Sequence, residues 1–283
     1  MAGHQLDARD SGAKANVFIQ LLVVVVFRFM TLGFVRRWLK SPGSIVFPFP
    51  GICIKSTPFT STSEADAMRF VSQNTAIPVP KVYCAFEHKK RAYIVMQRIK
   101  GQDLSFGWVQ RSEESKSRIL DELKSMMQQL RRLAPPSGIS VANVNGGAIY
   151  DQRLPKKSFW GPFATIREFH RELRNGIEAE NIQDDKATPG LKDLIAFHDQ
   201  SWPQPVFTHG DLSSLNVIAQ GDKVVGIIDW ETAAWMPPYW EYTSAWNVNP
   251  QNRFWQKEVD KFLDPMPRAL EMERIRRQYF GDF

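Results

Sequence analysis

Apolar and polar positions follow three different patterns along the chain. Residues 17–35 are almost continuously apolar, whereas residues 44–96 carry short runs of β-branched and aromatic residues separated by proline and glycine. The second pattern predicts short strands of a small sheet. From Ser112 onward, apolar residues recur every three or four positions, which predicts helices. We therefore expect an α+β chain in which a small β-rich part, residues 41–100, precedes a larger and mainly helical part, residues 101–283.

The β-rich part is expected to contain one helix among its strands. Strands are expected at 44–54, 81–86 and 91–96, followed by a connector at 97–101. Ser63 is a candidate N-cap for a helix that begins near Glu64. The segment Ile77-Pro78-Val79-Pro80 cannot continue this helix, because proline lacks the backbone N–H that a helix requires.

The helical part is expected to contain a β-hairpin after several helices. The apolar spacing predicts helices over 112–133, 165–173 and 191–202. Two apolar runs, residues 216–219 and 224–228, flank the turn sequence Gln220-Gly221-Asp222-Lys223, which predicts a hairpin that returns Asp229 toward Asn216.

The apolar run at 17–35 has two interpretations, and residues 1–40 are assigned to neither part. The run is nineteen residues long, but Gln20 and Arg28 interrupt it. An arginine near the bilayer centre costs about 2.5–3.5 kcal/mol on insertion scales. We favour a helix or strand buried in the small part. The alternative is a membrane anchor, which would hold the following domain on the cytoplasmic side through Arg36, Arg37 and Lys40.

Composition indicates a globular protein in a reducing compartment. The chain has 283 residues, of which 43% are hydrophobic and 23% charged, so it can bury a full core. The net charge of +6 suits a phosphate-bearing partner, but no basic run with interleaved aromatics appears, so we expect no nucleic-acid binding. Cys53 and Cys84 belong to no C-x-x-C motif or histidine cluster, which favours a cytoplasmic protein without structural zinc.

Candidate chemistry is concentrated between residues 207 and 231. His209-Gly210-Asp211 is followed by Asn216, and Asp229 ends an apolar run. Phosphoryl transfer requires a carboxylate that orients the acceptor hydroxyl, and Mg²⁺ that neutralises phosphate charge through hard oxygen ligands. Asp211 fits the first role, and Asn216 with Asp229 fits the second. The alternative for Asp211 is a turn aspartate that binds backbone amides.

Two neighbours of these residues have less certain roles. His209 is expected to pack and form hydrogen bonds rather than transfer protons. Glu231 would lie on the same side as Asp229 if the strand continued, where it would contact a metal or substrate directly or support a residue that does.

The two motifs together resemble the aminoglycoside phosphotransferase and choline kinase-like phosphotransferase enzyme family of the protein-kinase-like superfamily. That family has H-G-D-x-x-x-x-N and I-D-W, whereas protein kinases have H-R-D and D-F-G. The phrases I-P-V-P-K-V-Y, G-P-F and P-P-Y-W-E-Y resemble fungal members, so the resemblance covers about Lys55 to Tyr242. It implies a protein-kinase-like two-lobed fold, and it implies transfer of the γ-phosphoryl group of ATP, with Mg²⁺, to a hydroxyl of a small molecule.

The resemblance also implies a nucleotide site in the small lobe. Lys55 would bind phosphates and Glu64 would pair with it, while Met96 and Ile99 would contact the nucleotide. The alternative is that Lys55 is a solvated strand end and that Glu64 interacts with the dipole of its own helix. No glycine-rich loop precedes Lys55, so the nucleotide loop is degenerate or the lobe is shortened.

Two alternative functions stay open. The missing loop would suit a catalytically weak or inactive nucleotide-binding relative, and the apolar run at 17–35 would suit a membrane-tethered interaction protein. The sequence does not identify the acceptor. A dense aromatic group would suit a cationic substrate, but we favour a core role for it. Its members are Trp230, Trp235, Tyr239, Trp240, Tyr242, Trp246 and Trp255.

Overall fold

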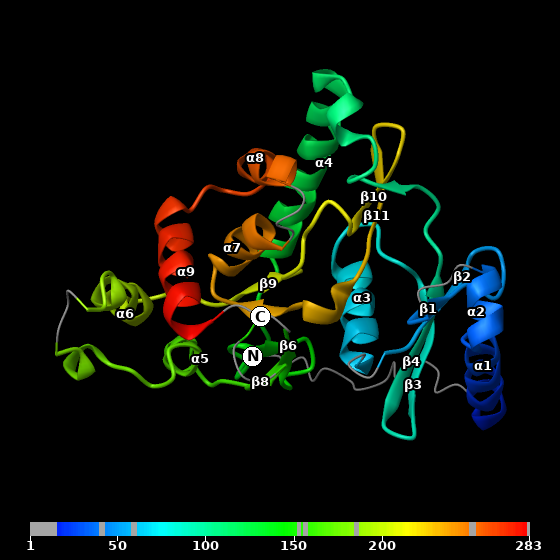
Figure 1. The fold of residues 1–283 in the computed structure, drawn as a ribbon, viewed down its shortest axis with the longest axis horizontal. Coiled ribbons are helices and arrows are strands. Elements are labelled where there is room, and N and C mark those ends of the chain that lie inside the picture. The colour runs from blue at the N-terminus through cyan, green and yellow to red at the C-terminus, as the bar shows by residue number, and fades with distance from the viewer. Residues whose placement is uncertain are drawn as a thin grey trace, which may run out of the picture. The chain divides into compact units, whose positions relative to one another are not determined.

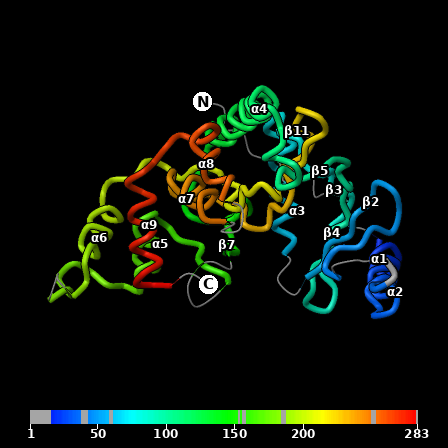
Figure 2. Tube along the Cα trace, turned by 45° about the horizontal axis from the view of Figure 1, so that its top comes forward, coloured from blue at the N-terminus to red at the C-terminus, as the bar shows by residue number. Residues whose placement is uncertain are grey.

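A computed structural model describes residues 16–39, 43–57, 61–151, 154, 158–183, 187–248 and 253–281. The described residues form a mixed α+β protein, as expected (Figures 1 and 2). The chain divides into two compact units, and the division falls inside a helix. The small unit comprises Met1–Ala65 and Pro80–Ile99, and the large unit comprises Asp66–Val79 and Lys100–Phe283.

A four-stranded antiparallel sheet forms the centre of the small unit. Its strand order is β1-β2-β4-β3, with β1 at Ile45–Val46, β2 at Ile52–Lys55, β3 at Val82–His88 and β4 at Arg91–Gln97. Lys89 and Lys90 connect β3 to β4, and both have positive φ angles of 50° and 61°. Two-residue hairpins favour such angles because they match the twist of the strands. The expected strand pair is therefore present.

Two helices precede this sheet, α1 at Val17–Met30 and α2 at Gly33–Leu39. Val23, Val24 and Phe27 of α1 are buried against sheet residues that include Ile54 and Tyr93. The Phe27 and Tyr93 rings meet edge to face, with centroids 5.6 Å apart. The expectation of a buried element at 17–35 is correct for this face only, because the opposite face of α1 is exposed. Within the described residues, no helix is long and apolar enough to cross a membrane.

Helix α3 spans Thr62–Asn74, so it begins two residues before the expected start near Glu64. The N-cap expected at Ser63 is wrong. Instead, Ser61 Oγ accepts a hydrogen bond from the backbone N–H of Ser63 at 3.2 Å, and the Ser61 carbonyl accepts one from Glu64 at 3.3 Å. Serines at 61 and 63 are equally good caps by residue type, and the hydrogen-bond geometry decides between them.

Besides the later part of α3, the large unit combines short sheets with six α-helices of the described chain. Its helices are α4 (Glu113–Arg131), α5 (Ile166–Leu173), α6 (Leu191–Asp199), α7 (Trp240–Asn247), α8 (Arg253–Phe262) and α9 (Pro267–Phe280). Its strands are β5 (Gln102–Asp103), β6 (Ala142–Asn143), β7 (Ile149–Tyr150), β8 (Phe159–Trp160), β9 (Val206–Thr208), β10 (Val217–Gln220), β11 (Lys223–Ile227) and β12 (Ala234–Met236). The sheet orders are β11-β10-β5, β6-β12-β9 and β7-β8.

Side-chain caps fix the helix starts that the apolar spacing predicts. Ser112 Oγ accepts from the N–H of Ser115 and begins α4, and Thr165 Oγ1 accepts from Glu168 and begins α5. Helix α6 ends at Asp199, three residues before the expected end, because Gln200 is already extended. The predicted hairpin is present as β10 and β11, with Gln220 opposite Lys223 across a two-residue turn.

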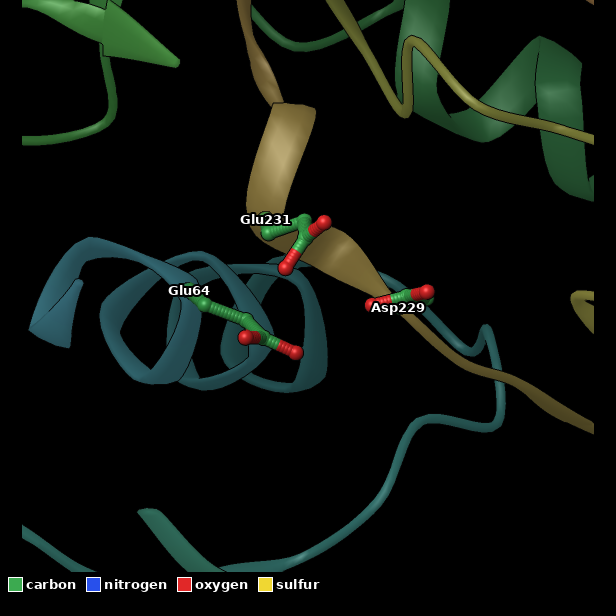
Figure 3. A group of neighbouring side chains, drawn as sticks. All are labelled: Glu64, Asp229 and Glu231. Atoms are coloured by element: carbon green, nitrogen blue, oxygen red, sulfur yellow. The ribbon is translucent and has the colours of Figure 1, made fainter. Parts of the chain in front are cut away.

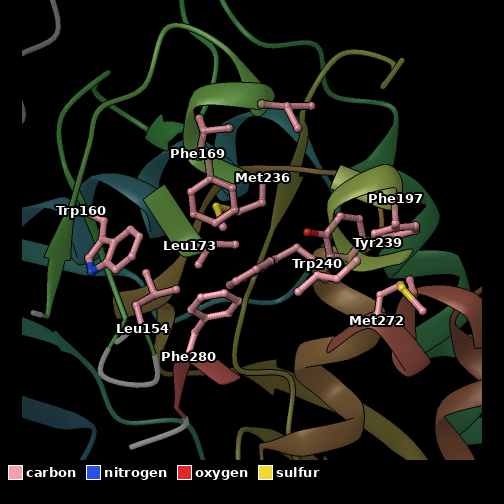
Figure 4. Close-up of a cluster of buried hydrophobic side chains, with 14 of the residues drawn as sticks. Leu154, Trp160, Phe169, Leu173, Phe197, Met236, Tyr239, Trp240, Met272 and Phe280 are labelled. Atoms are coloured by element: carbon pink, nitrogen blue, oxygen red, sulfur yellow. The ribbon is translucent and has the colours of Figure 1, made fainter. Parts of the chain in front are cut away.

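Aromatic side chains make up much of the core of the large unit. Figure 4 shows Trp160 from β8, Phe169 from α5, Tyr239 and Trp240 at the start of α7, and Phe280 from α9 within one buried cluster. The core role expected for the aromatic group is confirmed for six of its seven members. Trp230, Trp235, Tyr239, Trp240, Tyr242 and Trp255 are each at most 5% exposed, and Trp246 is partly exposed.

Two stacked histidines lie in the same core. The His170 and His198 rings are 4.2 Å apart, and Nε2 of His170 interacts with the Tyr239 hydroxyl at 2.8 Å. Burial lowers the pKa of His170 to about 3. Burial, followed by the effect of His170, lowers the pKa of His198 well below its usual value. Both rings are therefore neutral in the folded protein at neutral pH.

We expect this pair to make stability dependent on pH. Between about pH 6.5 and pH 3, the unfolded chain binds protons that the folded chain does not, so their contribution to stability is complete above about pH 6.5 and falls as the pH decreases. Urea unfolding at pH 7.0 and 5.5 should show this loss. The loss should be smaller for His198→Phe, because this variant lacks one of the two titrating rings. Nδ1 of His198 has no hydrogen-bond partner among the described residues, so the change breaks no bond at that atom. Equal losses in both proteins would contradict the assignment.

Candidate active site

A buried glutamate holds the backbone of the loop between β9 and β10. Glu241, in the first turn of α7, is 4% exposed. Its Oε2 accepts from the backbone N–H of His209 at 2.5 Å, and its Oε1 accepts from Gly210 at 3.1 Å. Charge-assisted bonds of this kind are stronger than bonds between neutral groups. Glu241 therefore fixes the start of the motif loop.

Glu241 is not identifiable as a site residue from the motifs in the sequence. The available signal was a charged residue inside the aromatic phrase Pro237–Tyr242, in a region expected to be core. A buried carboxylate requires hydrogen-bond donors, and backbone N–H groups are such donors. The sequence does not show which backbone groups these are.

Glycine is required at position 210 by both conformation and space. Gly210 has a φ of +77°, and a Cβ placed there would lie 2.9 Å from the carbonyl oxygen of Thr232. The Thr232 hydroxyl donates to the His209 carbonyl at 2.9 Å, which keeps the two segments close. The H-G-D form of the motif follows from this approach, since any other side chain would separate the segments.

His209 holds its own loop together. Its Nδ1 accepts from the backbone N–H of Asp211 at 3.2 Å, so Nε2 carries the proton and donates to the Ile228 carbonyl at 2.9 Å. The ring is fully buried and meets Trp230 edge to face at 4.6 Å. These contacts match the packing and hydrogen-bonding role expected for it.

Asp211 and Asn216 are brought together as the motif spacing implies. The Asn216 amide Nδ2 donates to the Asp211 backbone carbonyl at 2.7 Å and to its carboxylate Oδ2 at 2.9 Å. Trp255 Nε1 donates to the Leu212 carbonyl at 3.0 Å and supports the same loop. Asp211 is partly exposed, so its carboxylate is oriented and accessible. Because Nδ2 is directed to Asp211, Oδ1 is the Asn216 atom that can coordinate a cation.

Asp229 follows β11 in a strained conformation. The N–H of Ile228 donates to the Asn216 carbonyl at 2.9 Å, which places the chain just before Asp229 beside Asn216. Asp229 itself is in the left-handed region, with φ 67° and ψ 57°. Residues other than glycine occupy this region at a cost of about 1–3 kcal/mol, and such strain is concentrated at functional sites.

Glu231 does not lie on a continued strand. The strand β11 ends at Ile227, and residues Trp230–Thr232 form a 3-10 turn after Asp229, so the expectation based on strand alternation is wrong. The turn nevertheless brings one carboxylate oxygen of Glu231 within 4.8 Å of one from Asp229 (Figure 3). Both residues are partly exposed. Two carboxylates at this separation offer hard oxygen ligands that are close enough to bind the same cation.

In the small unit, Lys55 and Glu64 form a buried ion pair. Lys55 Nζ lies 3.0 Å from both carboxylate oxygens of Glu64, and the side chains are 6% and 1% exposed. Glu64 projects from the first turn of α3 (Figure 3). The alternative in which Lys55 is a solvated strand end is therefore wrong.

The other two residues expected to contact the nucleotide are Met96 and Ile99. Lys55 pairs with Ile94 across the sheet, and Met96 pairs with Cys53. Because side chains alternate along a strand, Met96 and Lys55 are on the same face. Ile99 lies beyond the end of β4 and is partly exposed. Burial, followed by Glu64, raises the pKa of the Cys53 thiol to about 12, so this cysteine is an inert apolar residue.

Comparison with known proteins identifies relatives of the chain. The sequence model of the phosphotransferase enzyme family matches residues 56–278. The match extends beyond Tyr242, where the motif resemblance ended. The clavilactone A biosynthesis cluster protein Y of Ampulloclitocybe clavipes is 26% identical over 195 residues, which are 60% of this chain and 48% of that protein. This chain therefore spans about half the length of that relative.

Solved structures show the same kind of fold. A thermostable mutant of aminoglycoside phosphotransferase APH(4)-Ia, in a ternary complex with AMP-PNP and hygromycin B, superposes with a TM-score of 0.57 and 16% identity. The match covers 86% of this chain and 88% of that one. Another thermostable mutant, in a complex with ADP and hygromycin B, has a TM-score of 0.55, 17% identity and coverage of 80% and 76%. The expected protein-kinase-like fold is thus confirmed.

We expect Gly210→Ala to destabilise the protein more than Gly221→Ala. Gly221 has a φ of +61° with open space around its Cβ position, so alanine there tests backbone strain alone. At Gly210 the clash with Thr232 adds to the same strain. Urea unfolding should give a loss of about 1 kcal/mol for Gly221→Ala and clearly more for Gly210→Ala. Equal losses would mean that the approach of Thr232 does not restrict this position.

Proposed function

The chain belongs to the phosphotransferase enzyme family, and from this premise we propose that it transfers the γ-phosphoryl group of ATP to a hydroxyl of a small molecule. The observation that carries the proposal is the pairing of Asp211 with Asn216 on a loop fixed by Glu241. A carboxylate that is oriented by a neighbouring amide, yet accessible, suits the positioning on which phosphoryl transfer depends.

Asp211 would orient the acceptor hydroxyl and accept its proton. As the hydroxyl oxygen forms its bond to the γ-phosphorus, the bond from that phosphorus to the bridging oxygen of ADP breaks, and the proton moves to the Asp211 carboxylate. The bond from Asn216 Nδ2 keeps Oδ2 in place. The other carboxylate oxygen of Asp211, Oδ1, would then be the one that faces the acceptor hydroxyl.

The oxygen ligands near Asp229 fit Mg²⁺. Carboxylate and amide oxygens are the donors that this hard cation prefers, and it retains water and phosphate oxygens in its other positions. Asn216 through Oδ1 and Asp229 through its carboxylate would hold the ion, with Glu231 close to Asp229. When bound, Mg²⁺ would neutralise charge on the triphosphate.

The small unit would contribute the nucleotide contacts. We propose that Lys55 binds phosphate oxygens and that Glu64 fixes the direction of its ammonium group, because the pair is buried and close. Met96 shares the face of Lys55 and would pack against the base, and Ile99 in the following segment would do the same. Use of ATP and the two free buried cysteines both suit a cytoplasmic location.

We propose a chemical class for the acceptor and not a particular compound. Hygromycin B is bound in the solved complexes of APH(4)-Ia. For this chain we propose a hydroxyl-bearing small molecule. A screen of ATP consumption against amino-sugars, amino alcohols and polyols would identify the class, and ATP hydrolysis without any acceptor would serve as the background.

One observation favours a second candidate, nucleotide binding without transfer. The turn between β1 and β2 is Phe47-Pro48-Phe49-Pro50-Gly51, where a glycine-rich loop would donate backbone N–H groups to phosphates. Pro48 and Pro50 have no N–H to donate. Titration that detects MgATP binding, combined with no consumption across the screen, would establish this second function.

We expect Asp211→Asn to separate binding from turnover. The amide is similar in shape but a poor proton acceptor, so turnover should fall about 10²-fold or more while nucleotide affinity is nearly unchanged. The measurement is ATP consumption with the acceptor from the screen, alongside calorimetric titration of MgATP. Asp193→Asn, an exposed position on α6, is the matched control and should keep full turnover. Full turnover in Asp211→Asn would contradict the role of Asp211.

We expect Asp229→Ala to abolish the Mg²⁺-dependent part of nucleotide binding. The triphosphate charge would then lack its carboxylate-held counter-ion. Titrations with MgATP and with ATP in chelator measure this part directly. Asp229→Asn controls for the backbone, because asparagine tolerates the left-handed conformation, and it should also weaken the metal-dependent part. Tight MgATP binding by both variants would place the metal elsewhere.

A further inference from the structure

Helix α1 is apolar on the face that points away from its sheet. The exposed residues recur at helical spacing, so they form one stripe opposite the buried Val23, Val24 and Phe27. The stripe consists of Phe18 (73% exposed), Leu21 (48%), Leu22 (53%), Val25 (63%) and Phe29 (58%) of α1, and it is followed by Leu32 (46%), just after the helix ends at Met30. In both views α1 lies at the side of the β1–β4 sheet, next to α2 (Figures 1 and 2).

A stripe of this kind indicates a surface that another phase or molecule covers. Soluble monomers scatter their exposed apolar residues, and a continuous apolar surface marks an interaction site. Helix α2 adds Phe34, which is 73% exposed. The stripe takes no part in the candidate active site, whose residues in this unit are on β2, α3 and β4.

The charge around the stripe is of one sign. Residues 11–63 contain six basic residues and no acidic one, while the rest of the chain is balanced at 30 basic and 30 acidic residues. The formal charge of +6 therefore equals the charge of this segment. Arg28 of α1 is exposed at one edge of the stripe, and Arg36 and Arg37, which are also exposed, follow on α2.

The apolar stripe and the arginines together indicate which kind of partner covers this face of α1. A two-fold contact with a second copy would bring two of these positively charged segments together, which is electrostatically unfavourable. A membrane span needs about 20 apolar residues, and α1 has 14. A helix that lies in a bilayer interface, by contrast, buries its apolar side chains while long basic side chains reach anionic headgroups.

We propose that the stripe of α1 docks on the surface of an anionic lipid bilayer, with α1 parallel to the membrane plane. Arg28, Arg36 and Arg37 would bind lipid headgroups, and the apolar side chains would enter the boundary between headgroups and acyl chains. Binding would be peripheral and reversible, and it would need both the apolar and the electrostatic contribution. This surface is separate from the proposed phosphoryl transfer and stands without it.

Flotation of the full chain with lipid vesicles tests the proposal. Vesicles of phosphatidylcholine with about 30% phosphatidylserine should bind the protein at least about tenfold better than phosphatidylcholine alone, and high salt should weaken this binding. The triple variant Phe18→Ser, Leu22→Ser, Phe29→Ser should lose at least about tenfold in binding. A double variant at exposed apolar sites of the large unit, Phe106→Ser with Val109→Ser, is the matched control and should bind normally.

A charge variant tests the electrostatic half separately. Arg28→Glu with Arg37→Glu should remove the preference for phosphatidylserine, whereas Arg132→Glu with Arg268→Glu, which changes charge equally on the large unit, should retain it. Circular dichroism and urea unfolding establish that each variant is folded. The proposal is overturned if the wild type fails to float, if the triple variant floats as well as the wild type, or if the protein forms a dimer that the triple variant disrupts while vesicles remain unbound.

Discussion

The bidentate contact of Glu241 with the backbone N–H groups of His209 and Gly210 organises the candidate site. It joins the first turn of α7 to the loop that carries Asp211. A carboxylate buried to this extent is tolerated only if its oxygens are hydrogen-bonded. The two N–H groups come directly after β9, which ends at Thr208, and buried N–H groups likewise need acceptors. Glu241 supplies acceptors to the two N–H groups, and these groups supply donors to its carboxylate. This contact therefore helps to set the direction of the Asp211 side chain. It also helps to set the position of Asp211 relative to the Asn216 amide that donates to it.

Other contacts connect the motif loop to the residues that follow β11. His209 connects its loop to the Ile228 carbonyl, Thr232 approaches Gly210, and Asn216 accepts from the N–H of Ile228. The two motifs, separated by a hairpin in sequence, are therefore joined by several short hydrogen bonds. Rigid support of this kind matters for phosphoryl transfer, because the reaction depends more on positioning and charge than on covalent chemistry by the protein.

Much of this arrangement could be predicted from the sequence, and the remainder has identifiable physical causes. The hairpin β10–β11 and the helix starts at Ser112 and Thr165 depend on local chemistry, namely turn residues and caps, which a sequence shows directly. The return of the chain just before Asp229 to Asn216 followed from the predicted hairpin. The role of Glu241 was missed because its partners are backbone groups 31 and 32 residues away. Glu231 was misplaced because the αL turn at Asp229 ends the strand alternation, and the half-buried state of α1 was missed because its two faces have the same apolar composition.

The backbone at Asp229 is left-handed, a conformation that favours glycine. Glycine would occupy the same φ and ψ without the steric cost of a Cβ atom, so it is the residue that local stability alone would select. The chain instead has a carboxylate there, at the expense of about 1 kcal/mol or more of local conformational energy. The stability of the turn alone therefore does not explain a carboxylate at this position. A charged side chain held at a conformational cost supports the metal-binding role that we propose for Asp229.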